Sequence, residues 1–227
     1  MGEIMVPNPI RLFHITAIDN LQKICQSGKL LCKNGCDSEY ICYQNIAHSG
    51  AQGARARLAV VDPPGGTIHD FVPFYFAPRS PMLYAINCGR VEGCEYRQED
   101  ILHFETTVDI ISGTGSEIVF FDRNATLAYA QPYTDISEIA FKVAWDLITE
   151  EPRLDGYCKY FQDSHQKEKY VDRMEKRMAE FMVEQQVALS CMTRIGVISE
   201  EKAEIVRAIL QKNSVELEVV VMQDWYF

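Results

Sequence analysis

The block from Phe71 to Ile86, FVPFYFAPRSPMLYAI, constrains the fold of this chain more than any other stretch. Its first part is rich in aromatic and β-forming residues and predicts a buried strand over 70–76. A short polar turn follows, and Ser80–Pro81 predicts the start of a helix. We expect Tyr75 on the strand to face Tyr84 beyond the turn, an arrangement that can sandwich a flat aromatic ligand.

The remaining apolar segments mix strands and helices without regular β-α-β repetition, which indicates an α+β fold. The expected strands are 9–15, 30–31, 70–76, 101–108, 117–121, 179–183, 195–198 and 217–222, and the expected helices are 20–25, 44–57, 167–178 and 200–212. The segment 131–167 lacks a strong period and predicts either packed short helices or a substrate-gripping loop. No stretch resembles a linker, so we expect one domain over residues 1–227.

The charge balance limits the classes of partner. The 22 Lys and Arg residues against 32 Asp and Glu residues give a net charge of −10, which argues against broad attraction to nucleic acid. A local basic groove is still compatible with this charge, although the same arginines also suit a solvated surface. No apolar run approaches the ~20 residues of a membrane span, and the N-terminus has no signal-peptide pattern, so we expect a soluble cytoplasmic protein.

The cysteines predict neither disulfides nor a metal site. Eight cysteines occur without a CxxC pair, which is typical of reduced core residues. Cys32, Cys36, Cys42 and His48 come nearest to a metal-binding set, but their intervals fit no usual zinc motif. We expect no metal.

Three polar positions stand out as candidates for chemistry. His14 lies on an apolar strand and, taken alone, suits a core histidine slightly better than a ligand contact. With Thr16 nearby, it can hold a ribose hydroxyl and the carboxamide of a nicotinamide dinucleotide, and the absence of GxGxxG excludes binding in the Rossmann manner. Glu180 opens an apolar strand, where it is either an edge charge or a carboxylate that stabilises an oxocarbenium-like sugar. Arg55 and Arg57 suit either a solvated pair or a phosphate site.

The chain resembles the DarT group of DNA ADP-ribosyltransferase toxins. The resemblance is carried by FHITAIDNL, GARARLAV, PPGGTIHDFVPFYFAPRSPMLYAI, KRMAEFMV and the terminal WYF, which cover nearly the whole length in the same order. YFA followed by serine and a later tyrosine also looks like the nicotinamide-binding region of the poly-ADP-ribose polymerases. The resemblance implies an ADP-ribosyltransferase fold, with split, mixed β-sheets flanked by helices.

The resemblance also implies a donor and an acceptor. NAD is the expected donor, and the expected acceptor is a base in single-stranded DNA, thymidine in the best-known branch of the family. Alternatives are guanosine in DNA, an RNA or protein acceptor, and a non-catalytic nucleic-acid-binding module. The implied setting is a toxin–antitoxin system or phage defence, with an antitoxin, typically a macrodomain protein, that removes the mark.

The family pattern, the aromatic block around Tyr75 and the arginines of a possible basic groove together give expected roles to individual residues. The residues expected to contact NAD are His14, Ile15, Thr16, Lys23, Leu31, Arg55, Tyr75 and Tyr84. Glu180 matches the catalytic glutamate, and the residues expected to contact DNA are Arg57, Arg79 and Arg177, with a substrate-reading loop region over about 124–180. Arg55 matches an arginine proposed to help deprotonate the base, but an arginine pKa above ~12 makes orienting the base or stabilising its anion physically easier.

Overall fold

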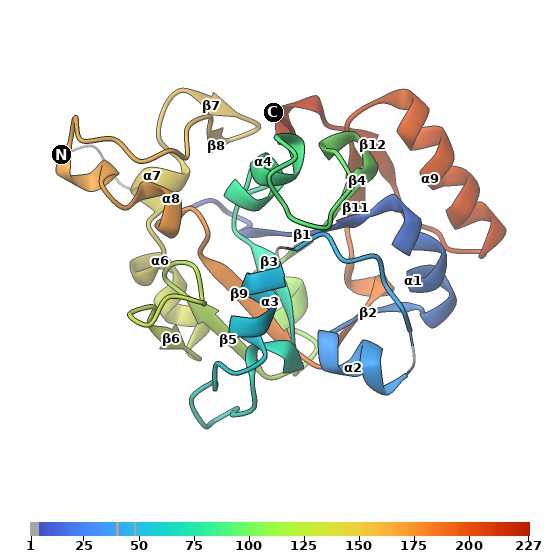
Figure 1. Cartoon of the computed structure of the whole chain (residues 1–227), viewed down its shortest axis with the longest axis horizontal. Coiled ribbons are helices and arrows are strands. Elements are labelled where there is room, and N and C mark those ends of the chain that lie inside the picture. Colours follow the sequence, from blue (N-terminus) through green and yellow to red (C-terminus); the bar gives the residue numbers. More distant parts are fainter. Residues whose placement is uncertain (1–4, 40, 48) are drawn as a thin grey trace.

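An eight-stranded mixed sheet runs through the centre of the molecule (Figure 1). The computed structural model describes residues 5–39, 41–47 and 49–227. The strand order is β12-β11-β4-β1-β3-β9-β5-β6, and β11 and β12 are parallel while the other neighbours are antiparallel. The strands of this sheet are β1 (Arg11–Ala17), β3 (Phe71–Tyr75), β4 (Ile101–Thr107), β5 (Ile118–Phe121), β6 (Pro132–Tyr133), β9 (Glu180–Glu184), β11 (Arg194–Val197) and β12 (Val219–Val221). Two small sheets pair β2 (Lys29–Leu31) with β10 (Gln186–Ala188) and β7 (Arg153–Leu154) with β8 (Tyr157–Cys158).

Short helices flank the sheet. They are α1 (Leu21–Ser27), α2 (Lys33–Ser38), α3 (Ser49–Arg55), α4 (Pro81–Asn87), α5 (Val108–Ser112), α6 (Ile139–Lys142), α7 (Trp145–Ile148), α8 (Arg173–Lys176) and α9 (Glu200–Lys212). In Figure 1, α1 and α9 lie together on one flank, and α6, α7 and α8 lie on the other. In the part of the chain that the structure describes, no helix has the length and apolar character needed to span a membrane.

The sheet splits between β1 and β3. β1 pairs with β4 along its whole length but meets β3 at one register position only, Phe13 opposite Tyr75. Pro73 explains the split, since proline has no N–H to give to a neighbouring strand. Its carbonyl accepts a bond from His14 Nδ1 at 2.8 Å. In an antiparallel strand, the N–H and C=O of one residue point to the same edge. Since the Pro73 carbonyl points to β1, the N–H that proline lacks would have pointed to β1 as well. A side chain therefore takes the place of the backbone ladder, and the two strands diverge.

The C-terminal residues close one side of the core. Trp225 is fully buried, and its ring meets Phe13 edge to face at 5.1 Å between centroids. Its Nε1 donates to Asp155 at 2.7 Å. Gly196 on β11 makes room for the indole, because a Cβ at this position would lie 2.1 Å from a ring carbon of Trp225. The terminal aromatic residues are thus tied to β1, the strand that carries His14.

The α+β expectation is confirmed, and the predicted strands and helices are present with ends shifted by a few residues. One helix was predicted wrongly, because 167–178 is not continuous. Its interruption has a local cause: the Tyr170 carbonyl accepts from Ser164 N (2.9 Å), and Met174 N donates to the side chain of Asp163 (2.8 Å). The i to i−4 bond that would join the two turns is therefore replaced, and only a 3-10 turn (Glu168–Tyr170) and α8 remain. The segment 131–167 forms short helices and the β7–β8 hairpin.

Candidate functional site

Two adjoining cavities open where the sheet splits. The first, of about 200 Å³, lies between β1, the start of α2, the segment 43–47 and α3. The second, of about 370 Å³, lies between β3, α4, the start of β9 and the segments 124–126 and 174–178. The residues that line both are His14, Ile15, Ala47, Gln52, Arg55, Pro73 and Met82. The sharing of these residues makes the two cavities parts of one cleft.

His14 stands on the wall between the cavities. Its Nδ1 lies 2.8 Å from the Pro73 carbonyl, which can only accept, so Nδ1 carries a hydrogen. Burial lowers the pKa of His14 and outweighs the opposing effect of this bond. The ring is therefore neutral at pH 7 and keeps Nε2 as an acceptor for a hydroxyl group.

Arg55 and Glu180 form a buried ion pair in the second cavity. Arg55 Nη1 donates to Glu180 Oε1 at 3.1 Å and Nη2 to Oε2 at 2.9 Å, and the two side chains are 15% and 2% exposed. Ala125 N donates to Oε1 at 3.3 Å and fixes the carboxylate from the other side. Burial acts to lower the pKa of Arg55, but the facing Glu180 carboxylate raises it overall. Arg55 thus remains a cation, which fits binding and charge stabilisation and does not fit a proton acceptor.

Tyr75 completes the central group. It lies directly opposite Glu180 in the β3–β9 pairing, so the two side chains are cross-strand neighbours. Its hydroxyl contacts Met82 Sδ at 3.4 Å, and burial raises its pKa, with Glu180 adding to the effect. His14, Tyr75 and Glu180 therefore come from three adjacent strands, β1, β3 and β9, and all three line the second cavity.

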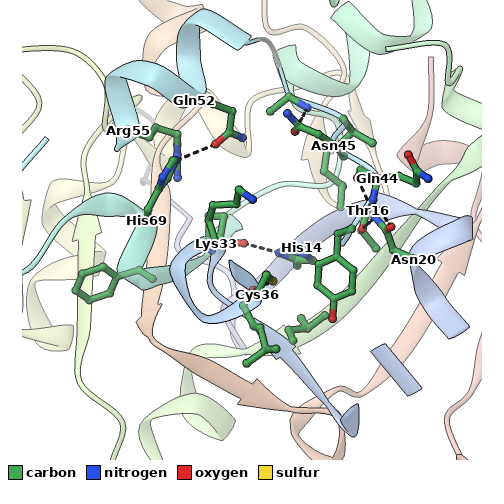
Figure 2. Close-up of a pocket in the computed structure, with 18 of the residues that line it drawn as sticks. His14, Thr16, Asn20, Lys33, Cys36, Gln44, Asn45, Gln52, Arg55 and His69 are labelled. Carbon is green, nitrogen blue, oxygen red and sulfur yellow. Dashed lines mark hydrogen bonds between the residues drawn. The ribbon is translucent and has the colours of Figure 1, made fainter. Parts of the chain in front are cut away.

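The first cavity has two polar sides (Figure 2). On one side Asn20 Nδ2 donates to Thr16 Oγ1 and to the Gln44 carbonyl, both at 3.0 Å, and Gln44 N donates back to Asn20 Oδ1 at 2.6 Å. Asn20 thereby holds the segment 43–47 against β1. This role was not predicted from the sequence, where Asn20 is the first residue of the helix expected over 20–25. Its side chain makes no cap bond and reaches the later segment instead.

The other side of the first cavity carries Arg55, Gln52 and His69 (Figure 2). His69 Nε2 lies 2.8 Å from Gln52 Oε1, and the amide oxygen accepts, so His69 is the donor. Burial lowers the pKa of His69, and the nearby charges of Arg55 and Lys33 lower it further. Because Gln52 lies one turn before Arg55 on α3, the neutral His69 ring anchors the helix that carries the arginine.

Tyr43 is a second residue that sequence reasoning missed. Its hydroxyl is buried and lacks a hydrogen-bond partner among the described residues, while its ring lines the first cavity beside Ile24, Leu30 and Cys36. The neighbouring Ser27 hydroxyl faces the carbonyls of Ile24 and Lys29, both at 3.0 Å, and its weak influence on Tyr43 is to lower the pKa that burial raises. A buried hydroxyl without a partner costs ~1–3 kcal/mol, so this position favours a ligand that supplies one.

The predicted site residues fall into two groups. Those that line the cavities are His14, Ile15, Thr16, Leu31, Arg55, Tyr75 and Glu180. Neither cavity, as the described residues define it, includes Tyr84 or Lys23. Tyr84 packs on Phe161 (5.2 Å) and Phe227 (5.1 Å), and Lys23 bonds to the Cys42 carbonyl. The predicted sandwich of Tyr75 and Tyr84 is not formed, because Tyr84 points from α4 toward the C-terminal aromatic residues.

The three arginines predicted to contact DNA differ in accessibility. Arg57 is exposed on the turn after α3. Arg79 is half-buried with its guanidinium 4.3 Å from the centroid of the Phe227 ring. Arg177 is 2% exposed and donates to the carbonyls of Ile148 (3.1 Å) and Arg79 (3.2 Å). Arg177 therefore has a structural role here instead of the predicted surface contact.

Among the residues that the structure describes, no three His, Cys, Asp or Glu side chains gather as a metal site. Cys32 and Cys36 are buried, and Cys32 Sγ accepts from Gly35 N at the start of α2. His48, the fourth member of the set considered from the sequence, lies outside the described residues.

Comparisons with known proteins agree over the full length. A DNA ADP-ribosyl transferase of Thermus sp. (strain 2.9) is 35% identical over 223 residues, which cover 97% of this chain and 98% of that protein. The structure of Thermus sp. 2.9 DarT in complex with ADP-ribosylated single-stranded DNA matches with a TM-score of 0.86 at 34% identity, over 100% of both chains. The same protein in complex with NAD⁺ matches with a TM-score of 0.83 at 33% identity, over 98% of this chain and 100% of that chain.

The family model for DarT, described as ssDNA thymidine ADP-ribosyltransferase, matches residues 13–227. The match begins at Phe13 on β1 and runs through the split sheet, the ion pair and the terminal aromatic residues. The ADP-ribosyltransferase fold expected from the sequence is confirmed, and this chain belongs to the DarT family.

Proposed function

We propose that this protein transfers ADP-ribose from NAD to a thymidine base in single-stranded DNA. The observation that carries the proposal is the buried pair of Arg55 and Glu180, held beside Tyr75 and His14 in one cleft. A buried carboxylate, fixed by a guanidinium and a backbone N–H, suits the stabilisation of positive charge on a ribose ring. Family membership supplies the donor and the acceptor, since the family is described by its thymidine reaction and a related structure contains NAD⁺.

The donor is expected to span the two cavities. In this assignment, nicotinamide and its ribose occupy the second cavity beside Tyr75 and Glu180, with His14 Nε2 accepting from a ribose hydroxyl. The adenosine end occupies the first cavity, where Ile15, Thr16 and Leu31 form the wall and Tyr43 offers its free hydroxyl. We assign no NAD contact to Tyr84 or Lys23.

The reaction then follows from the charges at the ion pair. The bond between nicotinamide and the ribose C1 breaks, its electrons leave with neutral nicotinamide, and Glu180 stabilises the cationic sugar. The thymine ring nitrogen forms the new bond to C1 and loses its proton to solvent. Because Arg55 stays protonated, we assign it the stabilisation of negative charge on the thymine imide as that proton departs.

Within the segment 124–180, the residues that line the second cavity are proposed to hold the DNA strand. Asn124, Thr126, Met174 and Met178 line the second cavity opposite Tyr75, so a base entering beside Glu180 meets this segment first. An unpaired strand is required, because a duplex hides the ring nitrogen that reacts. The exposed Arg57 and the half-buried Arg79 provide local positive charge in a chain of net charge −10.

The biological role is proposed on the same basis. A bulky ADP-ribose on thymine blocks base pairing, so we infer a toxin that arrests DNA replication in the cytoplasm, where NAD and DNA are both present. A partner that removes the mark is then required, and a macrodomain antitoxin is the proposed partner. We treat residues 1–227 as one catalytic unit, since strands from both ends of the chain share one sheet.

The test is mass spectrometry of short oligonucleotides, each with one base type at a defined position, after incubation with the protein and NAD. Addition of ADP-ribose to thymine alone is the expected result, and the Glu180→Gln variant serves as the inactive control. Addition to guanine would identify guanine, and not thymine, as the acceptor base. Addition to RNA or protein only, or no addition with NAD left intact, would refute the proposed reaction.

A further inference from the structure

Asn124 presents a weakly engaged hydrogen-bond donor beside the ion pair. It lies in the turn after β5, and its main chain is fully engaged. Its N–H donates to the Glu175 carbonyl at 3.0 Å, and its own carbonyl accepts from Leu127 N at 3.1 Å. The next residue is Ala125, whose N–H holds the Glu180 carboxylate. The position of Asn124 is therefore set by the backbone and is independent of its side chain's contacts with the cavity.

The side chain of Asn124 has one fixed orientation. Its Oδ1 accepts from Thr126 N at 3.0 Å and from Thr126 Oγ1 at 2.9 Å, the pattern of an Asx turn. Only the oxygen can accept these bonds, so the amide cannot be flipped. Nδ2 is left with two hydrogens, and among the described residues its hydrogen-bond contact is Met178 Sδ at 3.6 Å. A thioether is a weak acceptor, so the NH₂ group keeps most of its capacity to donate.

The surroundings favour a polar partner that arrives with the substrate. Asn124 lines the second cavity together with Thr126, Met174, Met178 and Glu180. Two methionines leave the amide hydrogens in a largely apolar setting, where an unmet donor is costly and a matched one is strengthened. A ligand with a hydrogen-bond acceptor at this position satisfies the Asn124 donor and forms a hydrogen bond that the apolar surroundings strengthen.

The chemistry of the bases decides which ligand matches. Thymine has one ring nitrogen that carries hydrogen, and a carbonyl oxygen lies on each side of it. Cytosine shares the carbonyl at C2 but has an amino group, a donor, where thymine has the carbonyl at C4. Adenine has an amino group at C6, and guanine has a carbonyl at C6 and an amino group at C2. We infer that Asn124 is a specificity-determining residue whose amide donates to the carbonyl oxygen at C4 of the base, next to the reacting nitrogen, and so selects thymine over cytosine. This inference rests on the proposed function.

Two substitutions of Asn124 test the role of its NH₂ group while they keep the turn that its side-chain oxygen forms. Asn124→Ser keeps a side-chain oxygen for the Thr126 N–H and, because the side chain is shorter, removes the NH₂ group from the cavity without adding charge. Asn124→Asp keeps the turn oxygen and puts a second acceptor where the NH₂ stood. The matched control is Asp135→Ser, because Asp135 accepts from Ser137 N (2.9 Å) and Oγ (2.7 Å) in the same kind of turn on the exposed surface.

The experiment measures transfer to oligonucleotides that carry a single thymine or a single cytosine, and NAD hydrolysis without DNA. For Asn124→Ser we expect transfer to thymine to fall ~10 to 100-fold relative to NAD hydrolysis, as the loss of one matched buried bond predicts. The ratio of transfer to thymine over transfer to cytosine should also fall in Asn124→Ser, and it should fall further in Asn124→Asp. In Asp135→Ser the thymine-to-cytosine ratio should equal that of the unchanged protein.

Three results would overturn the inference. An unchanged thymine-to-cytosine ratio in Asn124→Ser would show that the amide does not read the base. An equal loss of transfer and NAD hydrolysis would mean that Asn124 acts only through Ala125 and Glu180. An equal loss in Asp135→Ser would assign the effect to loosened turns. Absence of transfer by the unchanged protein is a different outcome, because it refutes the proposed function itself.

Discussion

Replacing Glu180 by glutamine tests the ion pair that underlies the proposed chemistry. Glutamine has nearly the same shape and keeps an oxygen for the Ala125 N–H, so the perturbation is the loss of one charge. Arg55, only 15% exposed, would then be a buried cation without its counter-charge. Removing one partner of a buried pair costs ~3–5 kcal/mol. We expect about 3 kcal/mol, the lower end, because the guanidinium keeps some contact with water.

The expected loss of stability is measurable by thermal unfolding. For a chain of this size, 1 kcal/mol corresponds to about 2–4 °C, so Glu180→Gln should melt about 6–12 °C below the unchanged protein. The double variant Arg55→Met/Glu180→Gln carries no unpaired charge and should regain most of this difference. Transfer to thymine should fall ~100 to 1,000-fold in Glu180→Gln and should not return in the double variant.

Two outcomes would refute this reasoning. A melting temperature of Glu180→Gln within about 2 °C of the unchanged protein would mean that the pair is screened by solvent and adds little to stability. Recovery of transfer in the double variant would mean that the Glu180 carboxylate serves only to neutralise Arg55. Stability without activity in the double variant is the combination that the structure predicts.

Three further predictions concern Tyr43 in the cleft and two residues of the core, Gly196 and His103. Tyr43→Phe should raise the KM for NAD about tenfold with little change in kcat, because in the proposed assignment the Tyr43 hydroxyl gains its hydrogen-bond partner from the bound donor. Gly196→Ala should lower the melting temperature by at least about 5 °C, since its Cβ would collide with Trp225. The same substitution should lower the melting temperature less when it is made in the Trp225→Leu variant. Burial lowers the pKa of His103 to about 4, so between pH 6.5 and 4 only the unfolded state gains this proton, and stability should fall as pH falls through that window. Urea unfolding of His103→Gln should show a flatter pH dependence there.

Local patterns were sufficient to predict most of the elements that carry the site. The β-forming block before Tyr75, the apolar strand around His14 and the apolar run after Glu180 each become a strand of the main sheet. Such segments predict strands because they are short apolar runs rich in β-forming residues, as expected of strands that are buried on both faces. The chain order of His14, Tyr75 and Glu180, read with the family's motifs, then indicated residues that the structure brings to one cavity.

Residues whose role depends on distant partners could not be predicted in this way. Tyr84 turns away from the cleft because Phe161 and Phe227, far along the chain, form its packing surface. Arg177 ends a charged segment, and its burial follows from carbonyls supplied by Ile148 and Arg79. Tyr43 belongs to a segment without a period, and the side-chain bridge from Asn20 to the backbone of residue 44 brings this segment to the cavity.

The split in the sheet links the fold to the reaction. A continuous ladder between β1 and β3 would use the edges of both strands and leave no space between them. Pro73 removes a donor from that ladder, and its carbonyl binds His14 instead, which sets the tautomer that leaves Nε2 free to accept. The same divergence exposes Tyr75 to the cavity while β3 stays paired with β9, where Glu180 lies opposite. Replacing Pro73 by a residue with an N–H should therefore weaken NAD binding by restoring pairing, although no catalytic group is changed.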